Sequence, residues 1–91
     1  MTYEEEIGPL REEIDRLNRE IVALLARRVD VALRIGKVKT RHGRPVVDRS
    51  REALVYKRVR GLAEGFNLIP DDVELVFREI IALCTRVQQE E

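Results

Sequence analysis

The sequence has very few of the residues that a disulfide, a metal site or a histidine-based catalytic site would need. Among its 91 residues there is one cysteine, Cys84, and one histidine, His42. A single cysteine excludes an intramolecular disulfide and any site of several thiolates. A single histidine excludes a cluster of histidine ligands for zinc. We therefore predict a chain that uses no metal, and no motif indicates a cofactor.

Long apolar runs and an excess of one charge are also missing. No stretch is apolar and long enough to span a bilayer, and the acidic start Met1–Glu6 does not resemble a signal sequence. We therefore expect a cytoplasmic protein with no membrane partner. The seventeen basic and seventeen acidic side chains cancel to a formal net charge of zero. Nucleic-acid binders usually carry a basic excess, so a nucleic-acid partner is disfavoured.

One apolar seam runs through the first half of the chain, where helix-breaking residues are scarce. Between Leu10 and Arg41 there is no proline and a single glycine, Gly36. Apolar side chains recur there at steps of three and four residues, which places them along one side of a helix. The members of this seam are Leu10, Ile14, Leu17, Ile21, Leu24, Val31, Ile35 and Val38.

This first helix is too long for a compact domain of its own chain. Thirty-two helical residues extend about 48 Å, whereas a compact chain of this length has a radius of gyration of about 12 Å. We therefore expect the seam to contact a second copy of the chain, most simply in a two-fold homodimer with the long helices paired.

Cap and turn residues set the ends of the first helix. We expect it to start at Gly8–Pro9, with Pro9 as the first helical residue and Glu4–Glu6 just upstream or in an extra turn. It should end at His42–Pro45, because glycine permits a left-handed cap and proline cannot continue a helix.

Two shorter helices are predicted to follow. Asp48 is a good N-cap for a helix over about Arg49–Glu64, with Gly65 as its stop, and Pro70 opens a third helix. The expected inward-facing residues are Val55, Val59, Leu62 and Phe66 in the second helix, and Val73, Phe77, Ile80 and Ile81 in the third. No strand pattern competes. The sequence therefore predicts an all-α fold, a single domain over residues 1–91 with one long and two shorter helices.

Arg28 occupies a position in the seam where the spacing requires an apolar residue. Lys39 lies eleven residues later, almost three whole turns, so the two cations share a face of the helix. Between them on that face lie two small residues, Ala32 and Gly36. A groove with a cation at each end suits a small dianion. A buried salt bridge that fixes the register of two helices explains Arg28 equally well, and the spacing leaves both interpretations open.

The shorter helices also carry polar residues on otherwise apolar faces. Asp48, Arg51 and Glu52 share one face, which a solvated first turn would explain. Cys84 and Gln88 continue the apolar face of the third helix; a cysteine there is usually a small buried hydrophobe, but a buried amide needs a polar partner. Every helix thus adds polar groups to its inner face, and ligand sites of helical bundles are built in this way.

Five short motifs occur in a fixed order. They are Leu10-Arg11-x-x-Ile14, Ala26-Arg27-Arg28, Gly36-Lys37-x-Lys39, Arg44-Pro45-Val46-x-Asp48 with Arg51-Glu52, and Phe77-x-x-Ile80-Ile81 with Gln88. Together they resemble the all-helical (AroQ-type) chorismate mutases from about Leu10 to Gln89. The resemblance implies a monofunctional enzyme that forms an intertwined homodimer and takes the dicarboxylate chorismate as its substrate.

The resemblance also implies how the substrate would be bound. Arg28 would bind one carboxylate and the partner subunit's Arg11 would bind the other, with Arg51 assisting one of them. Lys39 would donate to a carboxylate and to the ether oxygen of the breaking bond.

The remaining contacts implied by the resemblance lie around the ether oxygen and the ring hydroxyl. Gln88 would donate to the same ether oxygen as Lys39, and Glu52 and the Asp48 region would hold the ring hydroxyl. Cys84 stands where the family often has a small hydroxyl residue. A thiol is a poor hydrogen-bond donor, so this difference affects one peripheral contact.

The length of the first helix agrees with a shared site. Arg11 and Arg28 are separated by about 25 Å along one helix, a distance that one small substrate cannot bridge. In an antiparallel pair centred near Leu24, residue 11 of one chain lies beside the Arg28–Lys39 segment of the other.

The implied reaction is the Claisen rearrangement of chorismate to prephenate, a step of the shikimate pathway to phenylalanine and tyrosine. A pericyclic reaction needs no nucleophile, general base, metal or cofactor, which agrees with the missing residue types. Two alternatives are an isochorismate–pyruvate lyase of the same fold and a non-catalytic helical dimerisation module. In the second of these, the polar inner residues would only fix the register.

Overall fold

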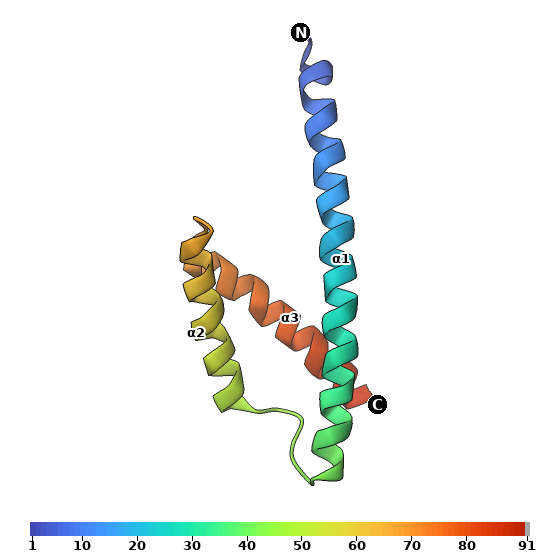
Figure 1. Cartoon of the computed structure of the whole chain (residues 1–91), viewed down its shortest axis with the longest axis vertical. Helices are drawn as coiled ribbons and strands as arrows, with labels where there is room; N and C mark the ends of the chain where they lie inside the picture. The colour runs from blue at the N-terminus through green and yellow to red at the C-terminus, as the bar shows by residue number, and fades with distance from the viewer. Residues whose placement is uncertain (91) are drawn as a thin grey trace.

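The computed structural model describes residues 1–90 and consists of three helices (Figure 1). They are α1 (Tyr3–Arg41), α2 (Arg49–Gly65) and α3 (Pro70–Glu90). Within the described residues there is no strand. The predicted all-α fold with one long and two shorter helices is therefore confirmed.

The start of α1 differs from the prediction at Gly8–Pro9. The helix begins at Tyr3, and Thr2 is its N-cap, with a side-chain oxygen that accepts a hydrogen bond from the Glu5 amide at 3.2 Å. Glu4–Glu6 form the first turn, where the helix dipole favours acidic residues. Pro9 lies inside the helix. Because α1 starts at Tyr3, Pro9 lies beyond the first turn, so it leaves the Glu5 carbonyl without its i→i−4 donor and its ring crowds that carbonyl. The observed start corresponds to the extra turn.

The two connections agree with their cap residues, with one correction. Gly43 has a φ of 64°, the left-handed conformation expected after α1. The Asp48 carboxylate caps α2 by accepting a hydrogen bond from the Arg51 amide at 3.0 Å. The predicted stop at Gly65 is displaced: Gly65 is still helical, and the left-handed residue is Asn67, with a φ of 59°. Asparagine tolerates this conformation better than most residues with a side chain.

The helices pack through α3, which contacts both α1 and α2 (Figure 1). No close backbone contact joins α1 to α2 in the described part of the chain. The N-terminal half of α1 extends beyond the other two helices. The molecule measures 62 × 27 × 15 Å and has a radius of gyration of 17.2 Å, against about 12 Å for a compact chain of this length.

The interior of the single chain is small. Its buried apolar side chains, among residues 1–90, are Ala32, Val59, Ala63 and Cys84. Leu62 and Phe66 were expected to face inward from the second helix, but they are 60% and 75% exposed, so this part of the prediction is wrong within one chain. The reason is that α3 is the helix packed against α2, and it covers the face of α2 around Val59 and Ala63.

The apolar seam of α1 is exposed along its whole length. Every apolar member is at least 44% exposed, from Leu10 at one end to Val38 at the other. A continuous apolar surface of this kind usually marks a contact with another molecule. None of the helices in residues 1–90 combines the length and the apolarity that crossing a membrane requires.

Candidate active site

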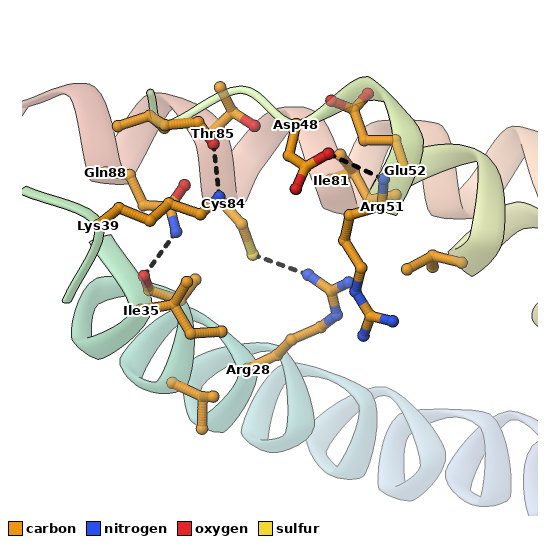
Figure 2. A pocket seen from close by; sticks show the side chains of 14 residues that line it. Arg28, Ile35, Lys39, Asp48, Arg51, Glu52, Ile81, Cys84, Thr85 and Gln88 are labelled. Carbon is orange, nitrogen blue, oxygen red and sulfur yellow. Dashed lines mark hydrogen bonds between the residues drawn. The ribbon is translucent and has the colours of Figure 1, made fainter. Parts of the chain in front are cut away.

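A cavity of about 350 Å³ lies where α1, the α1–α2 connection, α2 and α3 come together (Figure 2). All of the site residues predicted from the sequence line it, with the exception of Arg11. The residues of its wall are Arg28, Val31, Ala32, Ile35, Lys39, Val46, Asp48, Arg51, Glu52, Val55, Ile81, Cys84, Thr85 and Gln88.

Gln88 is anchored to α1 at a close contact between α1 and α3. Its Nε2 donates a hydrogen bond to the Ala32 carbonyl at 2.6 Å. The approach depends on Gly36, because a Cβ added there would lie 3.3 Å from Cγ of Gln88. The side-chain amide has a second N–H and a free carbonyl oxygen, so it can still donate to a ligand in the cavity.

Lys39 and Arg28 are also held in place by neutral partners. Nζ of Lys39 donates to the Val46 carbonyl at 2.8 Å, and Nη1 of Arg28 donates to Sγ of Cys84 at 3.1 Å. Lysine has three donors and arginine five, so each side chain keeps several N–H groups for a ligand. The thiol of Cys84 therefore acts as an acceptor in the wall of the cavity.

Three cations line the cavity, together with two carboxylates. Arg28, Lys39 and Arg51 all line it, and in the described part of the chain none of them forms an ion pair. Figure 2 shows Lys39 and Gln88 at one end, Arg51 at the other and Arg28 between them. Guanidinium and ammonium groups bind carboxylates through short, charge-assisted hydrogen bonds. The arrangement therefore suits a small ligand with more than one negative group.

Two carboxylates stand at the α2 end of the cavity, and both have other partners. One oxygen of Asp48 is used by the Arg51 amide in the helix cap. One oxygen of Glu52 accepts a hydrogen bond from Nη1 of Arg49 at 3.1 Å. Each carboxylate retains a second oxygen that can accept a hydrogen bond, for example from a hydroxyl group.

Arg11 does not reach this cavity within the same chain. It lies on the exposed N-terminal half of α1, and its guanidinium carbon is 6.0 Å from the centre of the Tyr3 ring. Arg11 cannot reach the cavity of its own chain because it lies about 25 Å from Arg28 along the helix axis.

Thr85 lines the cavity but was not singled out in the sequence. It lies between Ile81 and Gln88 in a pattern of i, i+4 and i+7, which places the three side chains on one face of α3. That spacing was the available signal. The Val46 carbonyl, which accepts the hydrogen bond from Lys39, could not be predicted from the sequence, because every residue has a carbonyl.

Comparison with known proteins gives a consistent result. The family model described as chorismate mutase type II matches residues 10–89. The T-protein of Haemophilus influenzae is 36% identical over 81 residues, which are 89% of this chain and 22% of that protein. A 4-amino-4-deoxychorismate mutase of Streptomyces venezuelae is 32% identical over 88 residues, 97% of this chain and 85% of that protein. A chorismate mutase of Methanocaldococcus jannaschii is 31% identical over 64 residues, which are 70% of this chain and 65% of that protein.

The chain thus spans about a fifth of the T-protein but most of the Streptomyces enzyme. The resemblance recognised from the five motifs is confirmed. With a family model that covers nearly the whole sequence and relatives that align along most of it, the chain belongs to the type II chorismate mutase family.

Proposed function

We propose that this chain is a chorismate mutase that rearranges chorismate to prephenate. Besides family membership, one observation carries the proposal: three cations and one amide, those of Arg28, Lys39, Arg51 and Gln88, line the same cavity. Within residues 1–90, none of the three cations forms an ion pair. Chorismate is a dicarboxylate, so its two negative groups can pair with these cations.

The proposed rate acceleration comes from stabilising charge in the transition state. Negative charge grows on the ether oxygen as the C–O bond breaks, and Lys39 and Gln88 lie at the same end of the cavity to donate to it. An acceleration of 10⁶ requires about 8 kcal/mol. Hydrogen bonds to charged groups contribute roughly 1.5–3 kcal/mol each. Two such donors, together with the restriction of a flexible substrate to its reactive conformation, are of the required size.

The other residues of the cavity would bind and orient the substrate. Arg28 would bind one carboxylate, and Arg51, at the α2 end of the cavity, would assist in carboxylate binding. Glu52 and Asp48 would accept a hydrogen bond from the ring hydroxyl, since each has a free oxygen.

We also propose that the chain acts as a two-fold homodimer in which the partner subunit's Arg11 completes each site. The exposed seam of α1 and the projecting N-terminal half of this helix support the pairing. In an antiparallel pair centred near Leu24, residue 11 of one α1 lies beside residue 37 of the other, at the Lys39 end of the cavity.

The direct test is to incubate the purified protein with chorismate and to follow the loss of its absorbance and the formation of prephenate. A parallel incubation with isochorismate tests the lyase alternative, which predicts salicylate and pyruvate. A dimerisation module without a site predicts no turnover and no rise in melting temperature with an inert transition-state analogue, whereas ligand binding to the folded state raises it.

A second candidate substrate is 4-amino-4-deoxychorismate, on which the Streptomyces relative acts according to its name. The observation that favours it is the pair of carboxylates, Asp48 and Glu52, at one end of the cavity. An ammonium group would be attracted there as readily as a hydroxyl. The ratio of kcat/KM for the two substrates decides which is preferred.

Gln88→Glu is expected to be active only at acidic pH. A carboxyl group can donate to the ether oxygen only when it is protonated, and its ordinary pKa is about 4.3. The neighbouring cations favour the ionised form, so activity should rise as the pH falls below 5, provided that the protein remains folded. Activity close to that of the unmodified protein at pH 8 would exclude the assigned role of Gln88.

Gly36→Val is expected to lower kcat/KM by about tenfold or more, because a displaced Gln88 would lose part of the roughly 100- to 1,000-fold that one donor to a developing oxyanion contributes. The added methyl groups would press on Gln88 and displace it from the Ala32 carbonyl. Gly61→Val is the matched control, since a Cβ at Gly61 meets nothing within 4 Å. Equal kinetics for the two variants would contradict this role of Gly36.

Cys84→Ser is expected to change kcat/KM by less than about threefold, because a hydroxyl accepts a hydrogen bond from Arg28 at least as well as a thiol. The change in side-chain volume is small, and steady-state kinetics with chorismate will measure the effect. A loss of about a hundredfold or more, equivalent to about 2.7 kcal/mol, would mean that the sulfur itself is required.

A further inference from the structure

Glu52 lines two cavities. The first is the proposed active site, and the second, of about 390 Å³, is lined by Val47 and by residues of α2 and α3. Three residues line both of them, namely Glu52, Ile81 and Thr85. Arg49 lines the second cavity and is absent from the wall of the first. Glu52 can therefore be contacted from the second cavity while it lines the first.

The contact that holds it comes from Arg49, one turn earlier on α2. Nη1 of Arg49 lies 3.1 Å from one carboxylate oxygen of Glu52. The Glu52 side chain is only 17% exposed, whereas that of Arg49 is 83% exposed. Among residues 1–90, no other side chain donates a hydrogen bond to this carboxylate. Arg49 thus contacts one oxygen of a sheltered carboxylate from the solvent side, and within residues 1–90 no hydrogen bond is made to the second oxygen.

Position 49 is not part of the motifs that identified the family. The motif Arg44-Pro45-Val46-x-Asp48 continues with Arg51-Glu52, and nothing in it concerns the residue between Asp48 and Ser50. On the sequence alone, Arg49 is one of fourteen arginines, most of them on exposed helix surfaces. Its relation to the site becomes visible only through the contact with Glu52.

We propose that Arg49 is a positioning residue that presents the free oxygen of Glu52 to the ring hydroxyl of the substrate. This inference rests on the proposed mutase function. Without Arg49, the Glu52 side chain would have to be ordered whenever a substrate binds, and that ordering weakens binding. Glu52 faces the ring and not the breaking bond, so the cost falls on KM and leaves kcat unchanged.

The test is a double-mutant cycle on the full chain with chorismate as the substrate. Arg49→Ala is expected to raise KM about three- to tenfold, the cost of ordering one or two side chains, with kcat within a factor of two. Arg49→Lys should recover part of the loss, because lysine retains a charged donor. In the Glu52→Gln background, Arg49→Ala should have no further effect on KM, since the carboxylate that it orients is gone.

Arg58→Ala is the matched control, because it removes the same charge from an exposed position of α2 that lines neither cavity. It separates the positioning effect from general attraction of a dianion and from changes in helix stability, which the melting temperatures of both variants report.

The inference is overturned if Arg49→Ala matches Arg58→Ala, if KM falls, or if the rise in KM persists in the Glu52→Gln background. If the unmodified chain does not convert chorismate at all, the proposed function fails and this inference fails with it. If the unmodified chain does convert chorismate and one of the three results named first is obtained, only the proposed role of Arg49 is excluded.

Discussion

Lys39→Ala is expected to lower kcat/KM for chorismate by about 100- to 1,000-fold, the usual loss when one donor to a developing oxyanion is removed. The ammonium group is held 2.8 Å from the Val46 carbonyl and has no ion-pair partner within residues 1–90. Its full charge is thus available to the substrate. Alanine removes the cation that lies beside Gln88, at the end of the cavity that we propose binds the ether oxygen.

The structure should tolerate this change. The lost hydrogen bond to the Val46 carbonyl costs roughly 1 kcal/mol, and alanine is the best helix former. Lys57→Ala, on the exposed surface of α2, makes the same replacement away from the cavity and should keep full activity. Circular dichroism will verify folding of both. A Lys39→Ala protein that stays within threefold of the unmodified kcat/KM would contradict the mechanism.

The second large effect concerns the proposed sharing of each site between two chains. Arg11→Ala and Arg28→Ala should each lower activity about a hundredfold or more as homodimers, because both remove a charged contact with the substrate. A heterodimer with one chain of each kind is different. One of its sites receives Arg28 from the first chain and Arg11 from the second, and is intact. The other site lacks both.

Co-expression of the two variants with different affinity tags, followed by purification on both, isolates this heterodimer. We expect about half of the unmodified activity per dimer, since one of two symmetric sites is complete. Mass spectrometry under native conditions will verify its composition. A heterodimer as inactive as the two parent homodimers would exclude a shared site, whatever the role of Arg28.

Local signals were sufficient to predict most of the fold. The seam of α1, the cap at Asp48 and the left-handed Gly43 depend on residues within a few positions of one another, and all three are observed. The start of α1 was displaced because two local rules competed there. Pro9 can open a helix, but the Thr2 cap with the acidic first turn stabilises an earlier start.

Predictions that depended on distant residues were less complete. Periodicity identified Leu62 as part of an apolar face, but it cannot say which helix covers that face. Among residues 1–90, no helix covers Leu62, which is 60% exposed. The hydrogen bonds from Arg28 to Cys84 and from Gln88 to the Ala32 carbonyl each join residues 56 positions apart. Their partners follow from the crossing of α1 and α3, which no single segment encodes.

The small interior of the single chain has a consequence for how the protein responds to dilution. With so few buried side chains, one chain gains little of the apolar burial that normally offsets the loss of chain entropy on folding. In the proposed dimer, the seam between two α1 helices supplies the rest, so folding and association become one equilibrium. The melting temperature then rises with protein concentration. Below the concentration at which the dimer dissociates, the chain loses its fold and its active site together.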